Sequence, residues 1–189
     1  MYGLVNQGVH RFVIENFGEA DWLELTEKAG VEETSFEGML TYPDAITYQL
    51  VGAICEKYDI AAADALEKFG SYWVGFSRAT AVGKLMRFGG QSLVDQLDSL
   101  NEMHARIKSN MPHLKPPHFE LEELGEDHFV LHYATEREGL EAMVIGLVKG
   151  LADEAGAAIS ITQLPAPSYE GLRASFDLRI LGDPEHAVT

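Results

Sequence analysis

The chain has 189 residues, 46% of them hydrophobic, so it is long enough to bury one sizeable core. Its 30 acidic residues outnumber its 14 lysines and arginines, which gives a formal net charge of −16. Such a surface repels phosphate groups and disfavours nucleic acid and anionic lipid as partners. The single cysteine, Cys55, excludes an intramolecular disulfide and a cysteine-rich zinc site, and its apolar surroundings predict a core residue.

The first residues have neither a basic leader nor a long apolar run, and no stretch is long and apolar enough to span a bilayer. We therefore expect a cytoplasmic protein. Helical periodicity predicts helices over residues 1–17 and 20–30. Thr41 and Asp44 predict a capping box that opens a helix to about residue 58. A fourth helix is predicted over residues 61–76 and a short one over 83–90.

Residues 92–111 predict a further helix, opened by a capping box of Ser92 and Asp95. His104 lies on its apolar stripe. An imidazole buried in such a stripe must form hydrogen bonds, stay neutral or bind a metal. A core histidine that is hydrogen-bonded to a carbonyl is the plainer alternative. The stripe consists of Leu93, Leu97, Leu100, Ile107 and Met111.

After Pro117 the pattern changes to the alternation of strands, over residues 118–123 and 128–135 and again over 158–164 and 172–181. Thr135 and Glu138 predict a capping box for a helix between the two pairs, running towards Ala155. The predicted fold class is therefore α+β. A helical N-terminal lobe precedes a β-β-α-β-β lobe with a mainly antiparallel sheet.

Tyr133, Thr135 and Arg137 alternate along extended chain, so their side chains should share one face. A phenol, a hydroxyl and a guanidinium together suit a carboxylate, which arginine binds bidentately. The alternative is that Arg137 pairs with a surface glutamate while Thr135 only caps the next helix. We refer to Tyr133, Thr135 and Arg137 as the triad.

Pro116 and Pro117 form a rigid pair without N–H donors, which alone would be read as a stiff loop. We interpret three features together: an imidazole on a helix, a rigid proline pair and a carboxylate-binding triad. They predict a flat, apolar ligand that carries a metal and two carboxylates. Haem b meets that description, with its iron on His104 and its propionates on the triad.

These residues make the chain similar to the haem nitric oxide/oxygen-binding (H-NOX) family, which includes the sensor domain of the soluble guanylate cyclase β subunit. The resemblance runs from MYGLVN to LHYATEREGLEAMVIGL. It implies that His104 is the proximal haem ligand, that Pro117 distorts the haem, and that Tyr133, Thr135 and Arg137 hold the propionates. Thr135 replaces the serine of the family's Tyr-x-Ser-x-Arg motif. The resemblance also implies one domain over 1–189, with haem between a distal lobe (1–60) and a proximal lobe (61–189).

Family members that hold O₂ carry a tyrosine where this chain has Met143, whose thioether cannot donate a hydrogen bond. The resemblance therefore predicts that ferrous haem here binds NO, and CO more weakly, rather than O₂. Trp73 or Tyr72 would restore O₂ binding if either donated to the bound gas. The other predicted residues of the distal pocket are Leu4, Val5, Val9, Trp73 and Leu147.

By family analogy, NO weakens the bond from iron to His104, and the two lobes then shift. No catalytic segment is evident, so we predict a non-enzymatic sensor that acts in trans. The expected partner is a histidine kinase or a cyclic-di-nucleotide synthase or phosphodiesterase. An O₂ sensor of the same fold is the main alternative. A haem-free enzyme using His104 or His132 as a general base is a remote one. Four histidines receive no role and are expected to be solvated: His113, His118, His128 and His186.

Overall fold

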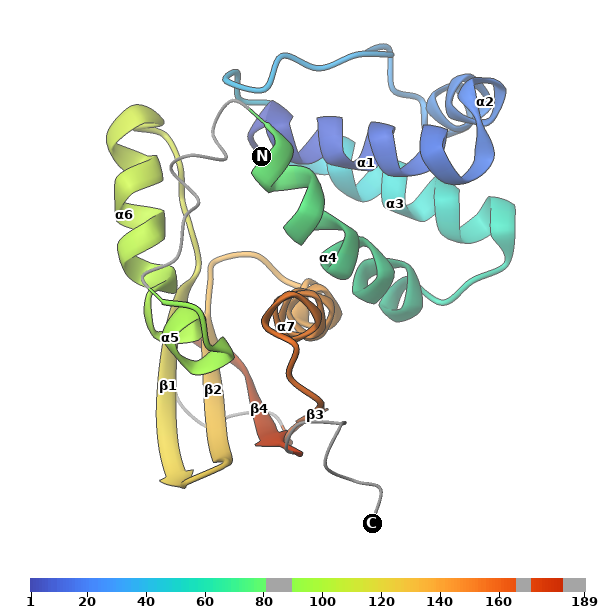
Figure 1. Cartoon of the computed structure of the whole chain (residues 1–189). Coiled ribbons are helices and arrows are strands. Elements are labelled where there is room, and N and C mark those ends of the chain that lie inside the picture. The colour runs from blue at the N-terminus through green and yellow to red at the C-terminus, as the bar shows by residue number, and fades with distance from the viewer. Residues whose placement is uncertain (81–89, 166–170, 182–189) are drawn as a thin grey trace.

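A computed structural model describes residues 1–80, 90–165 and 171–181 (Figure 1). Within these ranges an N-terminal group of helices packs beside a four-stranded sheet that carries three further helices. The α+β class predicted from the sequence is confirmed. The helices are α1 (Gly3–Phe17), α2 (Glu19–Ala29), α3 (Asp44–Tyr58), α4 (Ala62–Ala79), α5 (Leu93–Asp98), α6 (Leu100–Asn110) and α7 (Glu141–Ala155). The strands are β1 (His118–Gly125), β2 (His128–Ala134), β3 (Ile159–Gln163) and β4 (Leu172–Ile180).

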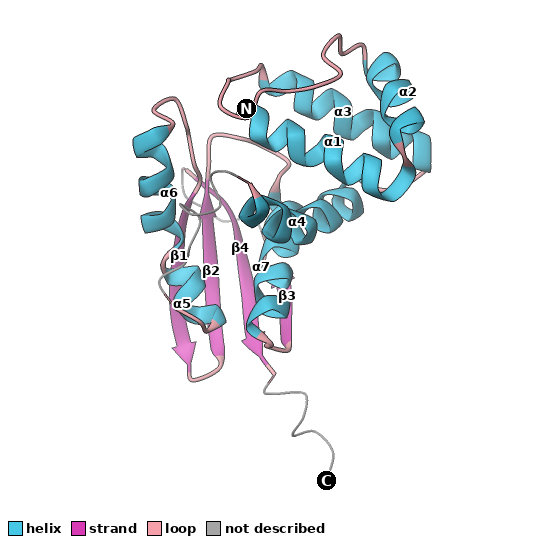
Figure 2. Ribbon diagram, turned by 45° about the horizontal axis from the view of Figure 1, so that its top comes forward, coloured by secondary structure: helices cyan, strands magenta, loops and turns pink. Residues whose placement is uncertain are grey.

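The sheet has the order β1-β2-β4-β3, and every neighbouring pair is antiparallel. Alternation separates its two faces, because successive side chains of a strand point to opposite sides. Leu131 and Tyr133 of β2 and Phe176 of β4 are buried on the face covered by α5, α6 and α7 (Figure 2). His132 and Ser175 lie opposite each other on the other face, which is largely polar.

Two clusters of buried apolar side chains form the core. One joins the sheet to α5, α6 and α7, and the other lies among α1, α2, α3 and α4. Helix α4 contributes to both, with Phe69 in the helical cluster and Val74 in the sheet cluster. It crosses α7 at very short range, since a Cβ atom added at Gly146 would collide with the carbonyl oxygen of Glu67. The α4–α7 crossing therefore connects the two halves of the core.

Three details of the helix predictions are wrong. Asp44 is the first residue of α3, and its N-cap, Pro43, has no side-chain hydrogen bond, so Thr41 and Asp44 form no capping box. The helix predicted over residues 92–111 is divided at Ser99, whose hydroxyl bonds the carbonyl of Gln96 and competes with the backbone. Helix α7 begins at Glu141 rather than near Thr135.

The Ser92 hydroxyl does accept a hydrogen bond from the backbone N–H of Asp95, as predicted. The helix predicted over 83–90 falls almost wholly outside the described residues. In the described ranges, every helix is too short or too polar to cross a lipid bilayer.

Candidate functional site

A large cavity of about 650 Å³ lies where α1, α3, α4, α6, α7 and the first two strands meet. Cofactors and drug-sized ligands bind in pockets of about 300–1,000 Å³ with mostly apolar walls, and this cavity has both properties. Residues from positions 1 to 151 contribute to its walls. Every site residue predicted from the sequence lines it: Leu4, Val5, Val9, Trp73, His104, Pro117, Tyr133, Thr135, Arg137, Met143 and Leu147.

His104 reaches the cavity from α6, and its ring stacks near Phe119 with 6.1 Å between ring centroids. Burial lowers the pKa of His104 to about 4, while the nearby backbone of Pro117 opposes this shift. Its Nδ1 atom is buried and has no hydrogen-bond partner in the described part of the chain. The imidazole is therefore neutral at pH 7, which is the protonation state that binds a metal.

Asn101, one turn before His104 on α6, ties this helix to β1. Its side-chain Nδ2 donates to the carbonyl of Phe119 at 2.5 Å, and its Oδ1 accepts from the N–H of the same residue at 3.0 Å. Because Phe119 follows Pro117 by two residues, this pair of bonds fixes the distance between the His104 helix and the proline pair. The sequence offered no periodicity or capping signal for this role.

The triad lies at one side of the cavity. Burial raises the pKa of the Tyr133 phenol to about 12, so it stays protonated and able to donate. Thr135 Oγ1 accepts the backbone N–H of Arg137 at 3.3 Å. The Arg137 guanidinium donates from Nε to Asp44 at 2.8 Å and from Nη1 to the carbonyl of Lys115 at 2.9 Å. Arg137 is thus paired with a carboxylate of the protein itself, although with Asp44 rather than with the surface glutamate given above as the alternative.

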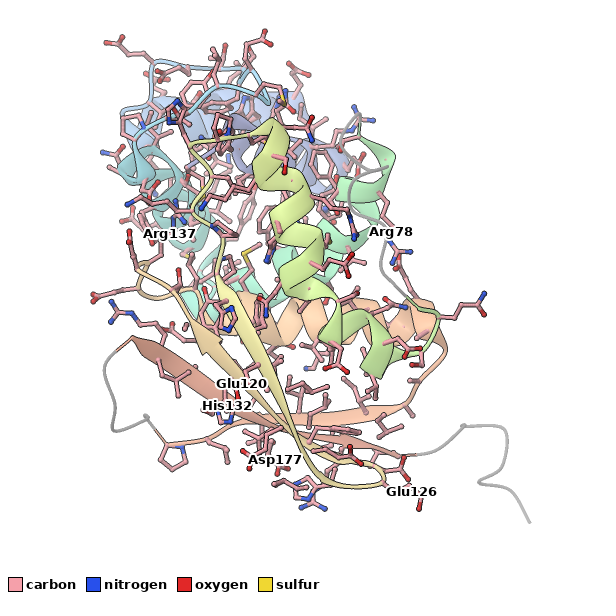
Figure 3. The ribbon with its side chains drawn as sticks, turned by 90° about the vertical axis from the view of Figure 1, so that its left-hand side faces the viewer. Arg78, Glu120, Glu126, His132, Arg137 and Asp177 are labelled. Atoms are coloured by element: carbon pink, nitrogen blue, oxygen red, sulfur yellow. The ribbon has the colours of Figure 1, made fainter. Side chains whose placement is uncertain are left out.

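Asp44 was missed as a site residue because the Thr-Tyr-Pro-Asp sequence reads as a helix start. The pKa of the Asp44 carboxyl group is lowered overall. Burial alone would raise this pKa, but hydrogen bonds from the Met1 amino group and Arg137 stabilise the charged form and outweigh burial. Tyr48, one turn later on α3, donates to the carbonyl of Glu138 at 3.1 Å. Figure 3 shows Arg137 at the level of the N-terminal helices, above the sheet. The cavity therefore has a polar, positively charged edge.

The opposite wall is formed by α1, α4 and α7, with Leu4, Val5 and Val9 contributed by α1. Met143 of α7 also lines the cavity. Tyr72 is turned away, since its hydroxyl donates to Glu15 at 2.9 Å on the exposed surface. Cys55 is half-buried and lines the cavity, so it is not the fully buried core residue that we expected.

The remaining histidines lie away from this cavity. His132 contacts Ser175 at 2.8 Å and Glu122 at 3.2 Å on the outer face of the sheet, where Figure 3 places it close to Glu120. His128 bonds Asp177 at 2.6 Å on the same face. His113 and His118 are exposed, and His186 lies outside the described residues.

The residues present fit haem on three independent grounds. The cavity is large and apolar, a neutral imidazole with an unpartnered buried nitrogen lines it, and a guanidinium lies at its edge. A family model described as haem-NO-binding matches residues 2–163. The chain belongs to the haem-NO-binding family. Members of this family are haem-based gas-sensor domains related to soluble guanylate cyclases, rather than catalytic domains.

Relatives support the same assignment. Soluble guanylate cyclase gcy-32 of Caenorhabditis elegans is 30% identical over 159 residues, covering 80% of this chain and 23% of that protein. Soluble guanylate cyclase 89Db of Drosophila melanogaster is 23% identical over 154 residues, covering 82% of this chain and 23% of that protein. The chain thus spans about a quarter of the length of these relatives.

Solved structures show the same fold. The H-NOX protein of S. oneidensis in the Fe(II)NO state superposes with a TM-score of 0.84 at 16% identity, covering 96% of this chain and 100% of that one. The unliganded Fe(II) H-NOX protein of K. algicida gives a TM-score of 0.83 at 17% identity, covering 97% of this chain and 98% of that one.

Proposed function

We propose that this chain is a sensor of NO that holds haem b in the 650 Å³ cavity, with CO as a weaker ligand. When bound, haem supplies a ferrous iron to which diatomic gases bind. The observation that carries the proposal is the neutral His104 imidazole within an apolar cavity that has Arg137 at its edge.

In this proposal different residues of the chain bind different parts of the haem. His104 offers a nitrogen lone pair, which burial keeps unprotonated at pH 7. Tyr133 and Arg137 donate to the propionates, and the Arg137 guanidinium exchanges part of its contact with Asp44 for them. Pro116 and Pro117 present a rigid, donor-free segment that lines the cavity with His104, and Pro117 would be the residue that distorts a bound haem.

The preference for NO over O₂ rests on the wall opposite His104. Bound O₂ gains from a hydrogen-bond donor, whereas NO binds ferrous iron well without one. Met143 provides a thioether there, and the Tyr72 hydroxyl is engaged by Glu15 on the surface. Trp73 also lines the cavity, and its indole packs on Gly8.

Signal output would use the α4–α7 crossing and α6. A change in the position of His104 moves α6, which Asn101 ties to the sheet. The sheet carries α7, which shares the cavity wall with α1 and α4. We propose that this rearrangement is read in trans by a histidine kinase or by an enzyme that makes or degrades a cyclic di-nucleotide.

Absorption spectra test the proposal. The protein is reconstituted with haem and reduced without oxygen, and its spectrum is recorded alone, with NO, with CO and in air. The proposal predicts stable NO and CO complexes and no stable O₂ complex. A stable oxy spectrum in air would favour the O₂ sensor, in which the Trp73 indole N–H is one candidate donor. Failure to retain haem would favour a haem-free role, although His132 lies on the opposite face of the sheet from Tyr133.

A further inference from the structure

A second cavity, of about 220 Å³, lies among α1, α3 and α4, which pack together in the N-terminal group of helices (Figure 1). Four apolar side chains line both this cavity and the larger one: Val9, Val51, Leu66 and Phe69. These four residues therefore form a shared wall. Ile54, Ile60 and Ala65 line the second cavity but not the larger one.

The walls of the second cavity are apolar and rich in aromatic rings. Phe12 and Phe69 lie edge to face, with 6.2 Å between ring centroids. Phe17 and Tyr58 are stacked at 4.0 Å, and Phe17 is 43% exposed, so this pair lies at the solvent side. An apolar cavity of about 150 Å³ is enough to bind benzene. A benzene ring with a short substituent therefore fits here and can pack on these rings.

Lys68 is the one charged residue that lines the second cavity in the described part of the chain, and its side chain is exposed at the rim. Acidic residues outnumber lysines and arginines by 30 to 14, so most cations of this chain have an anionic partner. Within the described ranges, Lys68 and Lys108 are the exceptions, since every other lysine and arginine there forms an ion pair.

Acidic residues on the neighbouring turns do not supply a partner for Lys68. Glu67 pairs with a lysine of α7 at 2.6 Å. Glu15 accepts the hydroxyl of Tyr72, one turn after Lys68, at 2.9 Å. Asp64 lies one turn before Lys68, at the spacing of helical ion pairs, yet the two form none and the Lys68 side chain lines the cavity instead. An unpaired ammonium therefore lies beside an aromatic cavity.

We propose that the second cavity is a binding site for a small aromatic carboxylate, whose ring enters the cavity and whose carboxylate pairs with the Lys68 ammonium. The inference goes beyond the proposed function, because neither His104 nor the triad lines this cavity. An occupant would contact the shared wall, and so the side chains that also line the larger cavity.

A mere gap in the packing makes different predictions. In that case Lys68 only extends its hydrocarbon chain over apolar surface and keeps its ammonium in water. The cavity would then bind a neutral aromatic molecule as tightly as an aromatic anion. Phenylacetate and its uncharged isostere phenylacetamide separate these two cases, and acetate shows what the carboxylate does without the ring.

The three probes are titrated into the haem-loaded ferrous CO complex, in which haem fills the larger cavity and the iron is diamagnetic. Calorimetry gives the Kd, and NMR of isoleucine methyl groups locates the probe. Lys68→Met removes the charge and keeps an apolar stem, whereas Ala65→Met fills the second cavity. Lys108→Met is the matched control, because Lys108 is equally exposed and has no ion pair with a described residue, but lines neither cavity.

Phenylacetate is expected to bind one to one and to shift the methyl signals of Ile54 and Ile60. The signal of Ile107, which lines the larger cavity alone, should stay unchanged. Lys68→Met is expected to raise the Kd for phenylacetate about fivefold, the upper range for an exposed ion pair, to the value for phenylacetamide. Ala65→Met should abolish binding of both aromatic probes, and Lys108→Met should change nothing.

Absence of saturable phenylacetate binding would overturn the inference. So would equal Kd values for phenylacetate and phenylacetamide, acetate binding as tight as that of phenylacetate, or equal effects of Lys68→Met and Lys108→Met. A shift at Ile107 alone would place the anion in the larger cavity and overturn the inference as well.

Failure of the chain to retain haem would overturn the proposed function and leave the second cavity to be tested separately. The same titration is then made on the haem-free chain carrying Arg137→Gln, which removes the cation at the edge of the larger cavity. Phenylacetate binding that persists in this variant and weakens on adding Lys68→Met would support the second site. Binding that Arg137→Gln abolishes would overturn it.

Discussion

Asp44 Oδ2 accepts a hydrogen bond from Arg137 Nε at 2.8 Å, although 93 residues separate the two in sequence. The bond joins the start of α3 to the loop that follows β2, at the edge of the cavity. The Met1 amino group also bonds Asp44, so one carboxylate holds two positive charges beside the predicted propionate site. Under the proposed function, Asp44 is therefore the group with which the haem carboxylates would compete for Arg137.

Asp44→Asn tests this competition. The change keeps an oxygen acceptor for Arg137 and removes a negative charge, so we expect slower haem loss, by several-fold at low salt, measured as haem transfer to excess apomyoglobin. Because Asp44 is more than one-third exposed, stability should fall by no more than about 1 kcal/mol. Glu24→Gln is the control, since Glu24 pairs with Lys57 and neither residue lines the cavity. Faster haem loss from Asp44→Asn would show that Asp44 orients Arg137 more than it competes for it.

Asn101→Ala tests the connection between α6 and β1. The substitution removes two hydrogen bonds and leaves the N–H and C=O of Phe119 without their side-chain partners, so unfolding in urea should show a loss of about 2 kcal/mol. Haem should also dissociate faster, because His104 and Pro117 are no longer held at a fixed separation. Asn110→Ala is the control on the same helix, since the exposed Asn110 side chain donates to the carbonyl of Arg106 one turn earlier. Equal losses in the two variants would contradict the assigned role.

Gly146→Ala tests the α4–α7 crossing. The added methyl group would overlap the carbonyl oxygen of Glu67, so the helices must separate and stability should fall by about 3 kcal/mol or more. Gly75→Ala is the matched control, because it lies within α4 with nothing within 4 Å of its added Cβ and should gain about 1 kcal/mol from helix propensity. Thermal unfolding measures both. A stabilising Gly146→Ala substitution would mean that the crossing is looser than described.

The pH dependence of stability tests the buried imidazole. His104 has a pKa of about 4 in the folded protein against 6.5 for an exposed histidine. The unfolded chain therefore binds a proton between pH 6.5 and 4 that the folded chain does not, and stability falls as pH falls through this window. The shift corresponds to about 3 kcal/mol for haem-free protein. Between pH 7 and pH 4, the free energy of unfolding of His104→Gln in urea should fall by about 3 kcal/mol less than that of the unsubstituted protein. If the free energies of unfolding of the two proteins fell in parallel with pH, the burial of His104 would be contradicted.

Much of this architecture follows from local patterns. The two hairpin strands and the strands around the last helix are visible as alternation, since one face of each is buried and the other is polar. The triad could be predicted because i, i+2 and i+4 spacing in extended chain fixes a common face, and all three residues line the cavity. His104 was identifiable because its position on an apolar stripe requires an explanation.

The errors arose where side chains have distant partners. Thr41 and Asp44 have capping-box spacing, but Asp44 instead bonds Met1 and Arg137, which no local pattern encodes. Thr135 and Glu138 fail as a cap because Glu138 pairs with Arg173 at 3.1 Å and its carbonyl accepts the Tyr48 hydroxyl. Asn101 gave no signal, because an asparagine within a helix reveals nothing of the residue that it bonds.

The measurement that tests the central claim most directly is the haem content of His104→Gly, with and without free imidazole. The account predicts that the purified variant lacks a Soret absorption band and that added imidazole restores it, because the free base replaces the lost ligand within an otherwise unchanged cavity. Arg137 and Tyr133 remain in this variant, so the test isolates the iron ligand. Undiminished haem content in His104→Gly without imidazole would show that another residue holds the iron and would contradict the account.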